Sequence, residues 1–261
     1  MDIEERQDRI AQLVRTRKKV KALALSEMFD VSVETIRKDL LDLQDRGVLV
    51  RVHGGAQVRP GGQESAYERR RSVNTTAKEA IAALAAHTLE DGATVYLDYG
   101  TTTYALAAAL VAANRRLTVF TNALPIANLL AQSETIDTVV LGGLLRRNER
   151  SLYGPLAEQA LGSIYLDAGF FGCAGLHATA GVTNHHALEG ASSRLAMSHC
   201  RNVIVLADSD KLDVIATNKI ADLDQIDLLF TNAAPSPELG AALDAAEVAV
   251  VTTEEQTDGL P

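Results

Sequence analysis

The sequence predicts an α/β protein with two domains, a small helical domain followed by a larger domain built on a mainly parallel sheet. Residues 20–56 combine two helices, a tight turn and a hairpin. From Ala77 onward, apolar segments of strand length alternate with Ala- and Leu-rich helical segments, which is typical of parallel α/β sheets. A chain of 261 residues, 47% of them hydrophobic, is long enough to form two cores.

The second helix of the small domain is predicted to begin near Val33 and to run to Arg46. Ser32 is a suitable N-cap, because its hydroxyl can accept from the unpaired N–H groups of the first turn. At 100° per residue, one side of this helix gathers Val33, Ile36, Leu40 and Leu43. The opposite side and its flanks carry Glu34, Thr35, Arg37 and Lys38. We expect the apolar side to pack inside the domain and the polar side to enter a DNA groove.

Two more helices and a β-hairpin, which we call the wing, complete this domain. Leu23–Phe29 is predicted to be a short helix, and Asp30–Val31 the turn that follows it. A stripe at helical spacing, made by Ile10, Leu13 and Val14, predicts a preceding helix that completes a three-helix core.

After Gly47, a suitable helix C-terminal cap, the chain is predicted to form a hairpin. Val48, Val50 and Val52 alternate there with Leu49, Arg51 and His53, before the turn Gly54–Gly55. Together these elements predict a winged helix-turn-helix over residues 1–58.

The motif S-V-E-T-I-R-K-D-L, followed by R-V-H-G-G-A, resembles the N-terminal signature of DeoR-family bacterial transcriptional regulators. Lys38 stands where that family often has a second Arg, and Val50 where another Arg is common. Lysine keeps the charge for a phosphate but lacks the bidentate fork that arginine offers to guanine. The expected DNA contacts are Lys21, Ser32, Glu34, Thr35, Arg37, Lys38, Arg51 and His53.

Charge is distributed unevenly along the chain, whose formal net charge is -9. Residues 1–58 hold 11 Lys and Arg against 10 Asp and Glu, and the remainder holds 14 against 24. The acidity therefore belongs to the larger domain. We expect a basic cluster to meet DNA phosphate; its members are Arg15, Arg17, Lys18, Lys19 and Lys21. The alternatives are a solvated basic turn and, for the whole domain, a protein-interaction role.

Composition excludes several classes of protein. The sequence has no apolar run of membrane-spanning length and no signal-peptide pattern at its start, so we expect a cytoplasmic protein. Cys173 and Cys200 lack metal-ligand spacing and are expected to be buried thiols, and neither a metal nor a cofactor is expected. Aromatic residues make up only 4%, which disfavours stacking on single-stranded nucleic acid.

The segment 59–76 is predicted to be a linker, because it is rich in Gly, Pro, Ser and charge and lacks a sustained apolar period. Arg69–Arg71 within it are expected to be a solvated charge run. The alternatives are contact with DNA phosphate and docking on the acidic domain.

The larger domain is predicted over residues 77–252. Seven segments have strand length, and most are apolar on both faces: 93–97, 117–121, 137–141, 168–172, 202–207, 227–231 and 248–251. Thr102–Ala113 and Ala123–Gln132 are helical candidates between them. In such sheets, sites form where loops converge at the carboxyl ends of the strands.

Two polar clusters follow predicted strands. The first, L-D-Y-G-T-T-T, precedes a helix and contains Asp98, Gly100, Thr101, Thr102 and Thr103. Its hydroxyls and the free N–H groups of the helix suit a phosphate. The equal alternative is that one Thr caps the helix and Asp98 holds the loop.

The second cluster, A-D-S-D-K, contains Asp208, Ser209, Asp210 and Lys211, and Lys211 suits a phosphate or a sugar oxygen. A surface Asp–Lys pair is the favoured alternative. Further strand-end candidates are Thr121, Asn122, Gly142, Gly143, Arg146, Arg147, the segment 172–175 and Glu189. His185 and His186 are adjacent, so they are not expected to share a metal.

The motifs L-D-Y-G-T-T-T, T-N-A-L, L-G-G-L-L-R, F-F-G-C-A-G and L-A-D-S-D-K resemble those of DeoR-family sensor domains and follow the same order. The resemblance implies a fold similar to ribose-5-phosphate isomerase and CoA transferases. It also implies an effector pocket lined by Asp98, Gly100, Thr101, Thr102, Thr103, Asn122, Glu189, Asp208 and Lys211. Tyr99 replaces a commonly small residue and Asp210 a common Ser, so the usual ligand could be altered.

The resemblance therefore implies a homo-oligomeric repressor of a carbohydrate-utilisation operon, released from double-stranded operator DNA by a phosphorylated sugar. Two alternatives stay open. One is a phosphosugar isomerase or deaminase fused to a DNA-binding domain, because Asp, Glu and Lys in such a pocket could move protons. The other is a plain oligomerisation domain with an empty pocket.

Overall fold

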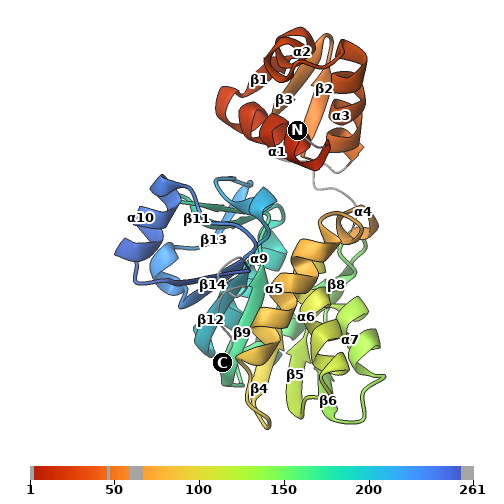
Figure 1. Ribbon diagram of the computed structural model, residues 1–261. Coiled ribbons are helices and arrows are strands. Elements are labelled where there is room, and N and C mark those ends of the chain that lie inside the picture. Colours follow the sequence, from red (N-terminus) through yellow and green to blue (C-terminus); the bar gives the residue numbers. More distant parts are fainter. Residues whose placement is uncertain (1–2, 46–47, 59–66, 254–261) are drawn as a thin grey trace, which may run out of the picture. The chain divides into compact units, whose positions relative to one another are not determined.

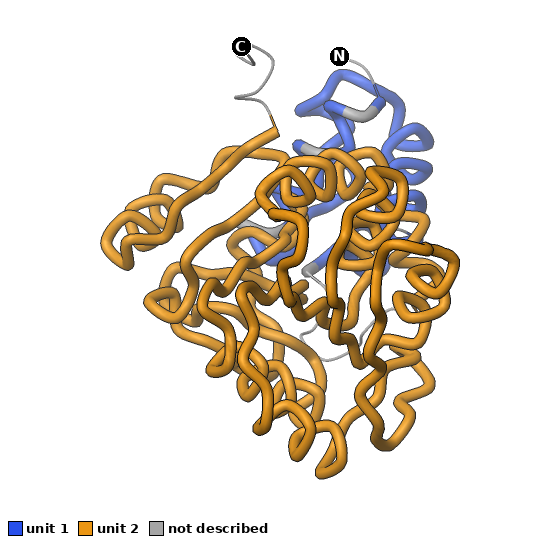
Figure 2. Tube along the Cα trace, turned by 90° about the horizontal axis from the view of Figure 1, so that it is seen from below, with its two compact units in different colours: residues 1–65 blue, residues 66–261 orange. Residues whose placement is uncertain are grey.

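The computed structural model describes residues 3–45, 48–58 and 67–253. The chain divides into two compact units, residues 1–65 and 66–261, which Figure 2 shows in different colours. Each unit has its own hydrophobic core, so each is described by itself.

The N-terminal unit has three helices, α1 (Ile3–Arg17), α2 (Ala22–Phe29) and α3 (Val33–Asp45). Its strands β1 (Lys19–Lys21), β2 (Leu49–Val52) and β3 (Gly55–Val58) form one antiparallel sheet in the order β1-β3-β2. The three helices and the hairpin of the predicted winged helix-turn-helix are thereby confirmed, whereas β1 is an addition. The expected helix end at Arg46 and the cap at Gly47 lie outside the described residues.

The core of this unit follows the predicted apolar positions. Ile36, Leu40 and Leu43 of α3 are buried against Ile10 and Val14 of α1. Leu49 of the hairpin is also buried in this core. The valines at 48, 50 and 52 alternate with it and were therefore expected on the other side of the strand.

One charged residue lies among these apolar groups: Asp39 is buried and accepts from Arg6 of α1 at 2.7 Å. This ion pair connects α1 to α3, and Gln7 donates to the same carboxylate at 3.3 Å.

Two residues require special backbone conditions. Asp30, at the C-terminal cap of α2, has a φ of 51°, a conformation that Asp adopts more readily than most residues. Gly55 approaches β1 so closely that an added Cβ would lie 2.0 Å from the carbonyl oxygen of Val20. The glycine of the predicted turn is therefore required by the pairing of β1 with β3.

The C-terminal unit is built on a seven-stranded parallel sheet in the order β15-β14-β12-β9-β4-β5-β6 (Figure 1). In chain order the strands are β4 (Thr94–Leu97), β5 (Leu117–Thr121), β6 (Ile136–Val140), β9 (Leu166–Gly172), β12 (Cys200–Leu206), β14 (Leu228–Thr231) and β15 (Ala249–Thr252). All seven predicted strands are present within a residue or two of their expected bounds.

Helices cover both faces of this sheet. The longer helices on one face are α5 (Thr75–His87), α6 (Thr101–Ala112) and α7 (Leu124–Leu130). The other face is covered by α8 (Pro155–Leu161), α9 (Ala187–Ser198) and α10 (Pro237–Ala245). Neighbouring strand residues point to opposite cores: Phe170 packs in the first and Phe171 in the second. Burial on both faces explains why these strands are continuously apolar.

The unit also contains smaller elements that the sequence did not predict. Strands β10 (Gly175–His177), β11 (Gly181–Asn184) and β13 (Asn218–Ala221) form a second, antiparallel sheet. A short hairpin is made by β7 (Leu144–Arg146) and β8 (Ser151–Tyr153). Two single-turn 3-10 helices, η1 (Ser209–Lys211) and η2 (Leu223–Gln225), complete the unit.

The start of the C-terminal unit differs from the predicted linker 59–76. Residues 59–66 lie outside the described residues, but helix α4 (Tyr67–Arg71) follows them directly, and α5 begins at Thr75. Tyr67 is buried, so α4 belongs to the folded unit. This segment escaped prediction because it is too short and too charged to show an apolar period.

Candidate functional site

The polar side of α3 lies on the surface, as predicted. Ser32 accepts from the backbone N–H of Thr35 at 3.0 Å and thus caps the helix. Glu34, Arg37 and Lys38 are exposed, and Arg37 forms a surface ion pair with Glu34 at 3.1 Å. Such an exposed pair contributes little to stability, so it leaves the guanidinium available to another partner.

The other predicted DNA contacts of this unit are exposed as well. Lys21 lies at the end of β1, Arg51 in β2, and His53 in the turn before β3. The backbone N–H of Arg51 donates to Gln44 at 3.1 Å, which ties the wing to α3. In the basic cluster, Arg17, Lys18 and Lys19 are also exposed, whereas the side chain of Arg15 is outside the description.

In the C-terminal unit, the predicted effector residues gather at the carboxyl edge of the sheet. Asp98 follows β4, Asn122 follows β5 and Asp208 follows β12, and these strands lie within four neighbouring positions of the sheet. We call this group, with Gly100–Thr103, Lys211 and Glu189, the candidate effector site.

Asp98 is fully buried and accepts from two hydroxyls, Tyr96 Oη at 3.1 Å and Ser193 Oγ at 2.7 Å. Burial raises the pKa of Asp98 to about 7, the hydrogen bonds from Ser193, the Tyr99 backbone and Tyr96 lower it, and the nearby charge of Glu189 raises it. This carboxyl group therefore changes its charge near neutral pH.

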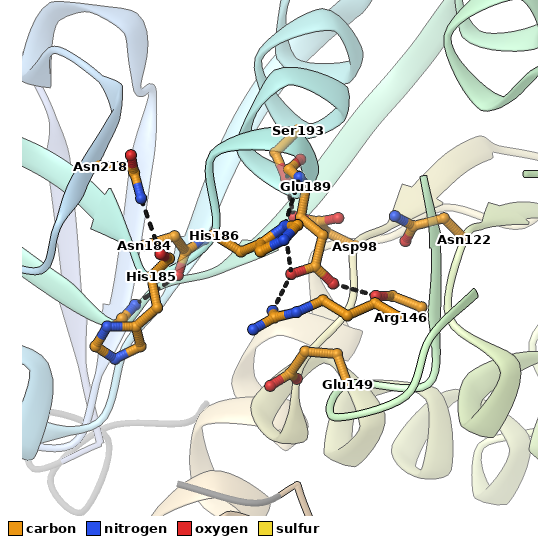
Figure 3. A network of polar contacts seen from close by, with 12 residues as sticks. Asp98, Asn122, Arg146, Glu149, Asn184, His185, His186, Glu189, Ser193 and Asn218 are labelled. Atoms are coloured by element: carbon orange, nitrogen blue, oxygen red, sulfur yellow. Dashed lines mark hydrogen bonds and ion pairs between the residues drawn. The ribbon is translucent and has the colours of Figure 1, made fainter. Parts of the chain in front are cut away.

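Glu189 is a second buried carboxylate, in the first turn of α9. It accepts from Arg146 of β7 and from Ser151 of β8, and His186 Nδ1 lies 3.7 Å from its Oε2 atom. Figure 3 shows the polar network around Glu189 and Arg146, with Asp98 beside it and Asn122 near it but joined to it by no drawn contact. The hairpin β7–β8 thus holds the α9 end of the candidate effector site.

The sequence analysis named Arg146 as a strand-end candidate, but no sequence pattern indicated Ser151 or Ser193. Serine is common on helices and in turns, so only the tertiary contacts distinguish these two.

Asn122 is fully buried and has an acceptor to spare. Its Nδ2 donates to the carbonyl oxygen of Leu152 at 3.2 Å. Among the described residues, its Oδ1 has no hydrogen-bond partner. A buried acceptor without a partner is unfavourable, and a hydroxyl of a ligand would satisfy it.

Gly100 forms the N-cap of α6 with a φ of 144°, which favours glycine. Because the cap has no side chain, the alternative in which a threonine caps this helix is not observed. The hydroxyl of Thr103 instead donates to the carbonyl oxygen of Gly100 at 3.1 Å. Thr102 and Thr103 are buried and Thr101 is partly exposed. The first turn of α6 is a positively polarised end with hydroxyls beside it.

The second cluster lies around η1. Asp208 is buried and caps this turn by accepting from the N–H of Asp210 at 3.0 Å, and Lys211 is half-buried at its other end. Among the described residues, no ion pair joins Asp208 to Lys211, so the alternative of a surface Asp–Lys pair is not observed.

Cys173 and Cys200 are half-buried residues, so the expectation of buried thiols is met only in part. Burial still raises the pKa of both Cys173 and Cys200 to about 12. Among the described residues, no group of three or more His, Cys, Asp or Glu could hold a metal ion. No helix among them is long and apolar enough to cross a membrane.

Lys78 of α5 is a residue that the sequence analysis missed. It is only 5% exposed, and its Nζ donates to the carbonyl oxygens of Arg70 and Val73. Burial lowers the pKa of Lys78 to about 8, and the charges that act on it include Asp208 and Lys211. A signal was available, because Lys78 shares one side of its helix with the buried residues Ile81, Ala82 and Ala85.

The arginines of α4 make more contacts than a solvated charge run would. Arg70 pairs with the buried carboxylate of Glu149, between β7 and β8. Arg71 donates to the hydroxyl of Tyr104 at 3.1 Å, and its guanidinium lies 4.4 Å from the centre of that ring. Arg69 is exposed, and its carbonyl oxygen accepts from the hydroxyl of Ser72 at 3.0 Å. The alternative of docking on the acidic domain is therefore correct for Arg70 and Arg71.

Comparisons with known proteins match both units. The family model described as DeoR-like helix-turn-helix domain matches residues 6–59, and the one described as DeoR C terminal sensor domain matches residues 73–233. The repressor GlcR of Bacillus subtilis is 32% identical and covers 97% of both chains. The glycerol-3-phosphate regulon repressor of Escherichia coli is 29% identical, over 88% of this chain and 91% of its own.

An L-fucose operon activator of Haemophilus influenzae is 30% identical, over 87% of this chain and 91% of its own. Among solved structures, ribose 5 phosphate isomerase A of Neisseria gonorrhoeae is similar to 51% of this chain and 52% of its own, with a TM-score of 0.39 and 13% identity.

Proposed function

The chain belongs to the DeoR family of transcriptional regulators, and we propose that it represses a carbohydrate-utilisation operon until a phosphorylated sugar releases it from its operator. Relatives named as repressors support this reading: GlcR matches nearly the whole chain, and another acts on a glycerol-3-phosphate regulon. The observation that carries the proposal is the joint presence of an exposed polar recognition helix and a separate polar cluster at a sheet edge.

The proposed DNA contacts are exposed or half-buried residues of the N-terminal unit. Thr35, Arg37 and Lys38 would reach base edges or phosphates from α3, with Ser32 and Glu34 at its first turn. Lys21, Arg51 and His53 would meet phosphates from β1 and the wing.

The proposed effector contacts divide by chemistry. The phosphate would lie at the first turn of α6, held by N–H groups and hydroxyls of Thr101 and Thr102, with Gly100 and Thr103 shaping the turn. Lys211 would add charge. The carboxylates and amide of Asp98, Asn122, Glu189 and Asp208 would accept from sugar hydroxyls.

Two states are required for such a switch, because a ligand that binds both states equally shifts nothing. We therefore propose a homo-oligomer in the cytoplasm that holds two DNA-binding units at the spacing of the operator half-sites. The test is a screen of phosphorylated sugars for release of the protein from its own upstream DNA. Release by one of them supports the proposal. Release by unphosphorylated sugars alone, or by none, would contradict it.

A second candidate function is favoured by one observation. The pKa of Asp98 is about 7, and the charge of Glu189 is one of the causes that raise it. Such pairs of carboxyl groups can transfer protons in enzymes. We nevertheless propose that the chain is not an enzyme, since a sensor gains nothing by consuming its signal. Incubation with ribose, fructose and amino-sugar phosphates separates the two. Conversion beyond one molecule per chain, abolished in Lys211→Ala, would establish the enzyme.

A further inference from the structure

Lys78 is a buried cation with neutral partners. Its ammonium group has three hydrogens to donate, and two of them go to the carbonyl oxygens of Arg70 and Val73, the latter at 2.6 Å. Within the described ranges, no carboxylate lies close enough to form an ion pair with it. A buried charge without a counter-charge is unfavourable, and an anion would relieve that cost.

Hydrogen bonds place the start of α5 beside η1 of the candidate effector site: the backbone N–H of Lys78 donates to the carbonyl oxygen of Asn74 at 3.0 Å, and the side chain of Asn74 donates to Asp210 at 2.9 Å. Asp208 and Asp210 raise the pKa of Lys78, while Lys211 and Arg70 lower it along with burial. The two carboxylates are occupied by other partners: Asp208 accepts from the N–H of Asp210, whose own carboxylate accepts from Asn74 at 2.9 Å. Lys78 near the start of α5 and Lys211 at the end of η1 are therefore on two elements that the Asn74–Asp210 hydrogen bond joins.

We propose that Lys78 binds the phosphate of the effector together with Lys211, and that the phosphate takes Lys78 from the carbonyl groups at the C-terminal end of α4. This inference rests on the proposed function and deepens it. Two ammonium groups match the charge of a phosphate monoester, whose second pKa near 6 leaves it mostly dianionic at neutral pH.

The exchange would loosen α4. A helix of five residues is too short to be stable on its own, so α4 depends on its tertiary contacts. These contacts include the burial of Tyr67, the pairs Arg70–Glu149 and Arg150–Glu68, the contacts of Arg71 with Tyr104 and of Arg150 with the Tyr67 ring, and the two hydrogen bonds from Lys78. Since α4 directly follows residues 59–66, which lead from the DNA-binding unit, its release would change how that unit is tethered.

The first experiment measures binding of inorganic phosphate to the full-length protein by calorimetry. In Lys78→Met, which keeps the length of the side chain without its charge, phosphate should bind at least tenfold more weakly than in wild type. Lys219→Met is the matched control, because Lys219 is exposed and pairs with Asp222 on the surface. Equal phosphate affinity in wild type and Lys78→Met would overturn the proposal.

The second experiment follows hydrogen exchange in the peptide that covers α4 and the residues up to Val73. Phosphate should speed this exchange about tenfold in wild type, because two hydrogen bonds to a charged donor are lost. Lys78→Met should show the fast exchange without phosphate and no further response. Exchange that phosphate leaves unchanged, or slows, would overturn the release of α4.

Two outcomes keep this inference separate from the proposed function. If Lys78→Met does not fold, the response of Lys78 itself decides: in wild type with ¹³C-labelled lysines, assigned with Lys78→Arg, phosphate should raise its pKa. A Lys78 signal that phosphate does not move would refute the inference. Failure of every phosphorylated sugar to release wild-type protein from the operator would instead refute the proposed function.

Discussion

Arg70 in α4 pairs with Glu149, a carboxylate that is 1% exposed and lies three residues beyond Arg146. Arg146 in turn binds Glu189 of the candidate effector site. One short hairpin segment therefore contacts both the site and the first helix after the connection to the DNA-binding unit. A ligand that draws Arg146 away from Glu189 acts on the same segment that holds Arg70.

The first prediction concerns the stability of this connection. Arg70→Ala removes the guanidinium that pairs with the buried carboxylate of Glu149, so the free energy of unfolding should fall by roughly 3 kcal/mol. Arg69→Ala is the control, because Arg69 is exposed, and it should change stability by less than about 0.5 kcal/mol. Urea unfolding measures both. Equal stability of the two variants would mean that the pair is not an anchor of α4.

The second prediction concerns α3. Arg37→Ala should weaken operator binding by roughly 1 to 3 kcal/mol and relax the preference at one base pair, if the guanidinium reads a base. The lost surface pair with Glu34 should itself matter little. Arg201→Ala, an exposed change in the C-terminal unit, is the control. Binding titrations on a set of single-base operator variants measure affinity and preference together, and an unchanged affinity would exclude the assignment.

The third prediction concerns the wing. Arg51 is exposed in β2 and should contact phosphate rather than a base. Arg51→Ala should therefore weaken binding to all sequences alike and reduce the slope of log affinity against log salt by about one. His53→Ala should act in the same direction. Operator binding measured at several salt concentrations gives the slope, and a slope identical to wild type would count against the phosphate contact.

The fourth prediction concerns pH. The pKa of Asp98 is raised from 3.8 to about 7, so the folded protein holds a proton that the unfolded chain releases at lower pH. This contribution to stability is complete below pH 3.8 and is lost as the pH rises through about 7. Relative to wild type, Asp98→Asn should gain stability as pH rises across this window, by a few kcal/mol, since one pKa unit corresponds to about 1.4 kcal/mol.

Unfolding in urea at a series of pH values tests this. Ser193→Ala provides a check in the other direction, because the hydrogen bond from Ser193 lowers the pKa of Asp98. That variant should move the loss of stability to higher pH relative to wild type. A difference between Asp98→Asn and wild type that does not vary with pH would show that folding leaves the pKa of Asp98 unchanged.

The parallel sheet could be predicted because each of its strands has a recognisable composition of its own. Residues 203–207 of one predicted strand are buried on both faces, so they appear as an uninterrupted apolar run. Strands β1 and β13 lacked that signal. Lys19–Lys21 has only one buried residue, and β13 is stabilised by pairing with β11, which is distant in sequence. Short strands of this kind are specified by their partners rather than by their own composition.

The candidate site was also predictable only in part. Strand-end residues such as Asp98 and Asp208 could be found, because the carboxyl ends of parallel strands lie along one edge. Lys78 and Ser193 lie on helices, and each reaches the site through a side chain whose target depends on how helix and sheet pack. A polar residue within an apolar helical side is the one signal that would have indicated Lys78.

The last prediction separates sensing from DNA binding. Thr102 is buried in the first turn of α6 and Lys211 is half-buried beside Asp208, both in the C-terminal unit, whereas the proposed DNA contacts belong to the other unit. Thr102→Val removes one hydroxyl with little change of volume, and Lys211→Ala removes one charge. Each variant should occupy the operator like wild type but need about tenfold more effector for release, since a lost contact of about 1.4 kcal/mol corresponds to that factor.

Release titrated with the phosphorylated sugar found in the screen measures this, with Lys219→Met as the exposed-lysine control. Release curves that match wild type would remove Thr102 and Lys211 from the effector site. Loss of operator binding in a variant that melts like wild type would have a different meaning. It would show that the site already differs between the DNA-bound and free states before any effector arrives, because only a site coupled to that equilibrium can alter DNA affinity when no ligand is present.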